Sequence, residues 1–80
     1  MARVRFFAQA RDAAGVREAE IPGETVAAVL DAAVVAYGEG LAAVIARSAV
    51  WLNGESADPT APVGAGDEVA VLPPVSGGGQ

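Results

Sequence analysis

Apolar and polar residues alternate at the start of the chain, which is the pattern of a strand with one buried face. The apolar face carries Val4 and Phe6, and the polar face carries Arg3 and Arg5. Phe7 breaks this alternation, because it places a large apolar ring on the arginine face. A second extended pattern covers residues 16–21 after a turn at residues 13–15, so the two segments predict a β-hairpin.

One long helix is predicted next. Its apolar residues recur at i, i+3, i+4, i+7, i+8 and i+11, which makes one continuous stripe along a helix. The stripe consists of Val26, Val29, Leu30, Ala33, Val34 and Tyr37. Thr25 suits the N-cap position and Gly38 is well placed to end the helix. A second apolar patch at residues 41–46 predicts a short helix or a turn.

Strand patterns return in the last third of the chain. Residues 49–52 form an apolar run in which we expect Trp51 to be a core residue. The run ends at Asn53-Gly54, the dipeptide that best suits a two-residue hairpin turn. Residues 68–72 form the last apolar run.

The order of these segments predicts the fold. A hairpin, one long helix and then further strands indicate an α+β protein with a mixed sheet packed on that helix. If the last strand returns to the centre of the sheet beside the first, the fold is a β-grasp. We expect one β-grasp domain over residues 1–75 and a flexible C-terminal tail at residues 76–80.

Composition restricts the chemistry that the chain can perform. It has no cysteine and no histidine, which excludes thiol nucleophiles, disulfides and the usual zinc ligands. No pair among its carboxylates is recognisable as a general acid and base, so we interpret them as solvated surface charge. They are Asp12, Glu18, Glu20, Glu24, Asp31, Glu39, Glu55, Asp58, Asp67 and Glu68. We therefore expect no active site of its own and no cofactor bound by the chain itself.

Charge indicates what the chain would bind. The formal net charge is −5, and all five basic residues are arginines. Such a surface disfavours nucleic acids and anionic membranes and favours a protein partner with a basic surface. Because no signal peptide or membrane-spanning run is recognisable, we expect a soluble, cytoplasmic protein.

The C-terminal glycines are the feature that suggests a function. Gly77-Gly78-Gly79 can pack little, and their lack of Cβ atoms would let a thin strip of chain enter a narrow channel. Pro73-Pro74 would stiffen the exit from the last strand and make the tail project. Adenylation would activate a carboxylate at its tip, and a sulfur donor could then convert the carboxylate into a thiocarboxylate.

Two blocks of sequence resemble the MoaD/ThiS family of ubiquitin-like sulfur carriers. The first block is residues 6–11, Phe-Phe-Ala-Gln-Ala-Arg, and the second comprises Gly-Asp-Glu-Val-Ala at residues 66–70 and Pro-Pro-Val-Ser-Gly-Gly at residues 73–78. The similarity spans essentially the whole chain. Within the family, the blocks are most similar to the small subunit of molybdopterin synthase.

The resemblance implies roles for particular residues. Gly78 would be adenylated by an E1-like enzyme that uses ATP and then converted to the thiocarboxylate, and Gly77 would allow passage through active-site channels. The large subunit of molybdopterin synthase would be the second partner, and cyclic pyranopterin monophosphate would receive the sulfur. An apolar sheet patch docks both partners in this family. Phe7 and Leu72 match that patch, with Val71 as a neighbour, although a core position suits Leu72 equally well.

The segment between the sheet and the glycines would enter the partners. It consists of Pro73, Pro74, Val75 and Ser76. The chain departs from the family pattern beyond them, because Gly79 and Gln80 follow the second glycine. A peptidase could remove both residues, which is the alternative that we favour. A second alternative is that only Gln80 is removed. A third is that the extension is inert and that the protein is a relative that is never activated.

Three other functions remain open. The chain could carry sulfur to thiamine, cysteine or another thio-metabolite, and removal of its last residues would favour that option. It could be a protein modifier that is attached to lysines through its C-terminal glycine. It could also be a non-reactive β-grasp interaction module.

Overall fold

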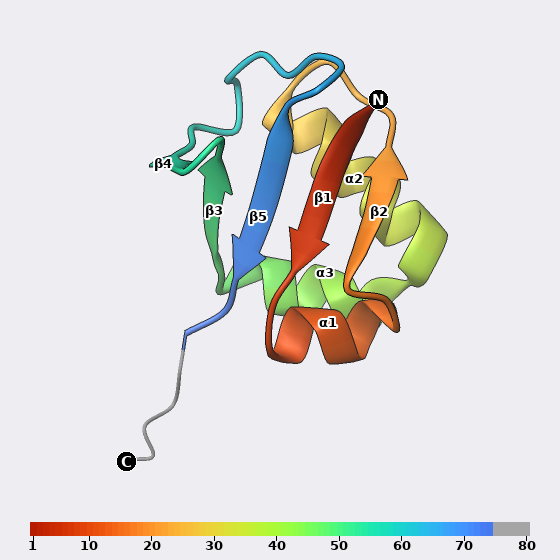
Figure 1. Cartoon of the computed structure of the whole chain (residues 1–80). Coiled ribbons are helices and arrows are strands. Elements are labelled where there is room, and N and C mark those ends of the chain that lie inside the picture. Colours follow the sequence, from red (N-terminus) through yellow and green to blue (C-terminus); the bar gives the residue numbers. More distant parts are fainter. Residues whose placement is uncertain (75–80) are drawn as a thin grey trace.

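The computed structural model describes residues 1–74 as a mixed β-sheet with three helices (Figure 1). The strands lie in the order β2-β1-β5-β3-β4. Along the chain the elements are β1 (Ala2–Phe6), α1 (Gln9–Ala14), β2 (Glu18–Ile21), α2 (Val26–Tyr37), α3 (Glu39–Ala46), β3 (Ala49–Leu52), β4 (Glu55–Ser56) and β5 (Glu68–Leu72). This arrangement confirms the predicted β-grasp fold.

The first and last strands lie side by side at the centre of the sheet. β1 and β5 pair in parallel, with Val4 opposite Val69 and Phe6 opposite Val71. All the other pairings are antiparallel. The alternation in β1 is confirmed, because Ala2, Val4 and Phe6 are buried whereas the arginines between them are exposed.

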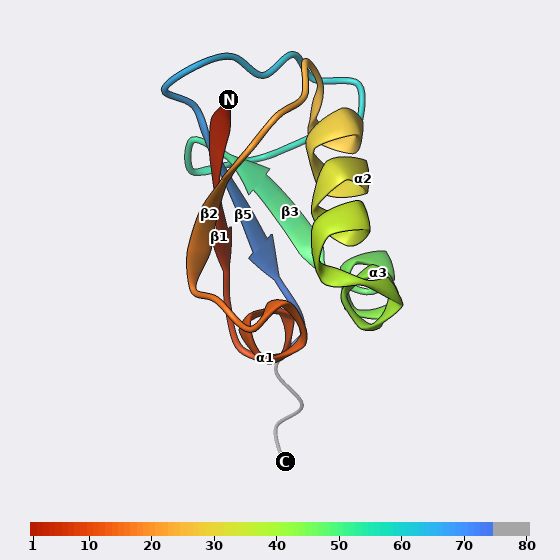
Figure 2. The same cartoon turned by 90° about the vertical axis from the view of Figure 1, so that its right-hand side faces the viewer.

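Helix α2 covers one face of the sheet (Figure 2) and has the bounds that its apolar stripe predicted. Thr25 is its N-cap, and the Thr25 hydroxyl accepts a hydrogen bond of 3.1 Å from the Ala28 amide. Gly38 ends the helix with a φ of 101°, in the region that favours glycine. The residues that face the sheet most directly, Val26, Val29 and Ala33, are fully buried.

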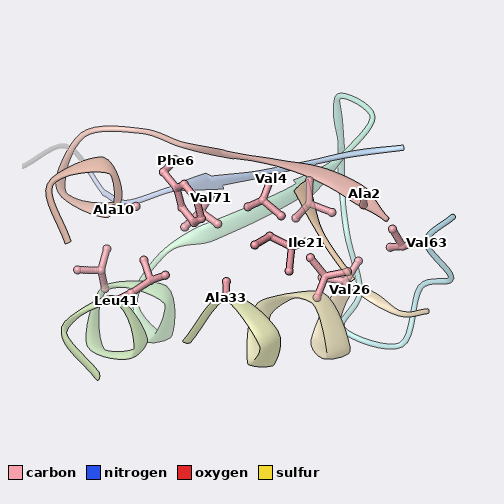
Figure 3. Close-up of a cluster of buried hydrophobic side chains, with 13 residues drawn as sticks. Ala2, Val4, Phe6, Ala10, Ile21, Val26, Ala33, Leu41, Val63 and Val71 are labelled. Atoms are coloured by element: carbon pink, nitrogen blue, oxygen red, sulfur yellow. The ribbon is translucent and has the colours of Figure 1, made fainter. Parts of the chain in front are cut away.

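The core lies between this helix layer and the sheet (Figure 3). Leu41 and Val44 of α3 extend it beyond the end of α2, and Ala10 of α1 lies at the same end of the core as Leu41. The rings of Phe6 and Tyr37 meet edge to face, with their centroids 5.8 Å apart. Residues 41–46 are thus helical, which resolves the expected choice between a short helix and a turn.

None of the helices in residues 1–74 is both long and apolar enough to cross a membrane.

The connection between β1 and β2 differs from the prediction. A tight turn was expected at residues 13–15, but helix α1 occupies Gln9–Ala14, and the turn follows at Gly15 with a φ of 80°. As a result β2 begins at Glu18 instead of residue 16. Packing explains the difference, since α1 buries Ala10 and lays Ala13 and Ala14 against the core.

The later turns agree with the sequence. Asn53 and Gly54 both have positive φ, at 52° and 85°, as a type I′ hairpin turn requires. They join β3 to β4, in which Leu52 pairs with Glu55. The segment at residues 59–63 is irregular apart from one isolated bridge between Thr25 and Pro62.

The start of α1 holds a strained residue and gives a first testable prediction. Ala8 has a φ of 50° and a ψ of −122°, a combination that glycine adopts far more readily than alanine. We expect Ala8→Gly to raise the free energy of unfolding by about 1 kcal/mol, measured by urea denaturation. Ala28→Gly, at an exposed position inside α2, is the control and should lower it by about 1 kcal/mol. If Ala8→Gly lowered the free energy of unfolding, the backbone of Ala8 would not be strained.

Candidate functional site

The sheet has one uncovered face. Figure 2 shows α2 and α3 on one side of the strands and no helix on the other side. We call this second side the open face. Because successive residues of a strand point to opposite sides, the residues between the buried ones of β1 and β5 belong to the open face. They include Arg3 and Arg5 of β1 and Ala70 and Leu72 of β5.

The structure places Phe7 and Leu72 next to each other. The Phe7 amide donates a hydrogen bond of 3.2 Å to the Val71 carbonyl, so the β1–β5 ladder continues one residue beyond β1. Phe7 therefore lies beside Leu72 on the open face, and both residues are half-buried. Val71 belongs to the core instead, since its side chain has no exposed surface. The use of Phe7 and Leu72 in docking stays a prediction.

Trp51 corrects the sequence analysis. We expected it in the core, but it is 39% exposed and lies on the open face. The half-buried residues Val50 and Leu52 of β3 pack against the core instead. The four residues of β3 are all apolar, so the pattern alone could not tell which pair is buried.

Trp51 pairs with Ala70 of β5, and Ala49 pairs with Leu72. Together with Phe7 these residues make an apolar area over β3, β5 and the end of β1. We call it the apolar half of the open face: Phe7, Ala49, Trp51, Ala70 and Leu72.

The opposite half of the open face is charged. Arg3 Nε lies 3.6 Å from Glu20 Oε2, and Arg5 Nη1 lies 3.7 Å from Glu68 Oε2. These pairs are about half exposed, so they contribute little to stability. The Arg5 guanidinium also lies over the Phe7 ring, at 5.2 Å from its centroid, and so joins the charged half to the apolar half.

The base of the tail leaves the sheet next to this area. Pro73 follows Leu72 directly and is buried, whereas Pro74 is exposed. The exit of the chain is therefore anchored one residue beyond β5. The remaining predicted residues, Val75, Ser76, Gly77, Gly78, Gly79 and Gln80, lie outside the described residues.

The titratable groups do not form an acid–base pair within residues 1–74. Hydrogen bonds from the backbone amide and the hydroxyl of Thr60 lower the pKa of Asp58. A hydrogen bond from the Gly64 amide and a second from the Asn53 side chain lower the pKa of Asp67. No group of three or more acidic residues in this part of the chain could hold a metal ion.

The two shifted carboxylates stabilise turns. Asp67 Oδ2 accepts from the Gly64 amide at 2.8 Å, and its Oδ1 accepts from Asn53 Nδ2 at 3.1 Å. Asn53 in turn accepts from the Glu68 amide at 2.9 Å. Asp67 and Asn53 thus connect the β3–β4 turn to the start of β5.

Comparison with known proteins places this chain in a family. The ThiS family model matches residues 4–78, so the chain belongs to the ThiS family. SAMP1 (small archaeal modifier protein 1) from Haloferax volcanii is 34% identical, with a TM-score of 0.80 over 95% of this chain and 97% of that one.

Two molybdopterin-converting factors are also similar. A putative subunit 1 from Pyrococcus furiosus is 27% identical, with a TM-score of 0.77 over 92% of this chain and 97% of that one. A chain in the complex of subunits 1 and 2 from Helicobacter pylori is 27% identical, with a TM-score of 0.68 over 92% and 93% of the two chains. The predicted MoaD/ThiS family, which comprises ubiquitin-like sulfur carriers and modifiers, is confirmed.

The Asp67 network gives a second prediction. A folded-state pKa below the unfolded value of about 3.9 means that ionised Asp67 stabilises the fold above that pH. The stabilisation is lost as the pH falls through the lowered pKa of the folded state. Asp67→Asn should therefore lower the melting temperature at pH 7, and the loss should shrink as the pH falls through the lowered pKa of Asp67. Asp31→Asn, which removes an exposed charge from α2, is the control. If the fall in melting temperature for Asp67→Asn were the same at every pH, the ionised carboxylate of Asp67 would not be the stabilising group.

Proposed function

We propose that this chain is a sulfur carrier for molybdopterin synthesis whose reactive group is the Gly78 carboxylate. The carboxylate would attack the α-phosphate of ATP in an E1-like enzyme and release pyrophosphate. A sulfur donor would then displace AMP and leave a C-terminal thiocarboxylate. In the large synthase subunit, the sulfur of this group would bond to cyclic pyranopterin monophosphate, and water would hydrolyse the acyl–sulfur bond and restore the carboxylate.

The observation that carries the proposal is the extent of the family match. It runs through the sheet and ends at Gly78, the second glycine of Pro-Pro-Val-Ser-Gly-Gly. A carrier that ends at this residue would present a small, unbranched carboxylate. Removal of Gly79 and Gln80 by a peptidase is therefore part of the proposal.

The described residues support a partner that covers the open face. Phe7 and Leu72 lie beside Pro73, where the tail begins, so a protein docked on the apolar half would sit next to the base of the tail. The partners that we propose are the E1-like enzyme and the large synthase subunit. The large synthase subunit as a partner receives support from the similarity to the Helicobacter pylori chain, because that structure is a complex of subunits 1 and 2.

A protein modifier is the second candidate, and the 34% identity to SAMP1 favours it. Both functions would need adenylation of the same terminal glycine. They differ in what attacks the activated carboxyl group, a sulfur donor in one case and the amino group of a target protein in the other. The protein contains no lysine, so its copies could not be linked to one another through lysine side chains.

The third prediction tests the sulfur chemistry. Chains that end at Gly78 and at Gln80 are incubated with the E1-like enzyme of the same organism, ATP and sulfide, and their intact masses are recorded. The Gly78 chain should gain about 16 Da, the difference between sulfur and oxygen, and the Gln80 chain should stay unchanged. Addition of the large synthase subunit and cyclic pyranopterin monophosphate should then restore the original mass.

Each other outcome identifies an alternative. A thiocarboxylate that the synthase subunit does not discharge would favour another sulfur pathway, and covalent conjugates to cell proteins would favour a modifier. A Gly78 chain that forms neither an adenylate nor a thiocarboxylate would contradict the proposal and favour a non-reactive interaction module.

The fourth prediction tests the apolar half. Phe7→Ala and Leu72→Ala should each weaken binding to the adenylating enzyme by about 10- to 100-fold, because central aromatic and aliphatic residues dominate such interfaces. Trp51→Ala should do the same. Val35→Ala is the control, since Val35 is 87% exposed on α2 and away from the open face. Equal affinities for Leu72→Ala and Val35→Ala by calorimetry would exclude docking on this face.

A further inference from the structure

A pocket lined by arginines lies next to the apolar half of the open face. Its volume is about 380 Å³, and it is open to solvent. Its lining consists of Arg5, Phe6, Phe7, Arg11, Arg17 and Glu18. Three of the five arginines of an acidic chain therefore surround one pocket.

The three arginines come from separate elements that the backbone holds together. Arg5 belongs to β1 and Arg11 to α1, and Arg17 immediately precedes β2. The Phe6 amide donates a hydrogen bond of 2.8 Å to the Arg17 carbonyl, which fixes the start of β2 against β1. The first turn of α1 is fixed in the same way, since the Ala10 amide donates to the Phe7 carbonyl at 2.9 Å.

The positive charge of the pocket is only partly neutralised. Arg5 pairs with Glu68, and Arg3 outside the pocket pairs with Glu20. Arg11 and Arg17 form no ion pair with any other residue in the range 1–74. Glu18 is the one carboxylate in the lining. The pocket is thus a local basic site on a surface whose net charge is negative.

We infer that this pocket receives the Asp or Glu side chains of the protein that docks on the apolar half. Phe7 belongs to both surfaces, so a partner that covers Phe7 would lie directly beside the pocket. Guanidinium groups bind carboxylates through paired hydrogen bonds, and a docked partner would shield those bonds from water. The inference rests on the docking part of the proposed function.

Exposure favours an acidic partner segment over a small free anion. The arginines that line the pocket are all exposed, and Arg5 keeps 46% of its side-chain surface open to solvent. Ion pairs at such sites are weak until a second surface excludes water. An acidic segment of a partner would also fix its orientation, because the remainder of this chain repels negative charge.

The test compares two double variants that remove equal charge. Arg11→Ala/Arg17→Ala removes two of the three arginines that line the pocket, and Arg3→Ala/Arg47→Ala removes two arginines outside it. Binding of the full chain to the adenylating enzyme is measured by calorimetry at about 50 mM and 500 mM salt. We expect the pocket variant to lose roughly 10-fold or more in affinity at low salt and less at high salt. The control should stay within about twofold of the parent chain.

Similar affinities for the two variants would overturn the inference and leave the proposed function intact, since adenylation of the otherwise unchanged chain that ends at Gly78 is assayed in parallel. If the parent chain binds no adenylating enzyme, nuclear magnetic resonance titrations with hexaglutamate and with inorganic phosphate decide. Shifts at residues 5, 7, 11 and 17 with hexaglutamate, lost in the pocket variant, support an acidic segment. Shifts with phosphate but not with hexaglutamate, or no shifts with either probe, would overturn the inference.

Discussion

The parallel pairing of β1 with β5 is the contact on which the rest of the structure depends. It joins residues 3–6 to residues 68–71, so nearly the whole chain forms the connection between the two paired strands. A parallel connection has to pass over the sheet, and here it carries α2 and α3 over one face. The buried side chains of Val4 and Val69, which are partners in this ladder, make the pairing part of the core.

Covering one face leaves the other face available for binding. That face has two chemical halves, with Trp51, Ala70 and Leu72 on one side and the arginine–carboxylate pairs of β1 on the other. Phe7 lies between them, under the guanidinium of Arg5. The apolar half and the arginine pocket beside it can combine apolar burial with charge selection when a partner protein binds.

Regular spacing explains which elements the sequence could predict. The stripe of α2 runs for three turns and gave the observed bounds, and the alternation of β1 was equally clear. Helix α1 has only six residues, and its apolar members are small alanines, so the pattern resembled a loop. All of β3 is apolar, which hid the exposed side of Trp51. The pocket could not be predicted, because Arg5, Arg11 and Arg17 meet only after β1, α1 and β2 have packed.

The apolar half also combines the two ends of the domain. Phe7 comes from the start of the chain and Leu72 from its last strand, and their contact exists only when β5 has entered the sheet. A chain that stops before β5 can display neither this surface nor a folded core. A partner that recognises Phe7 and Leu72 together would therefore bind only chains in which β5 has joined the sheet.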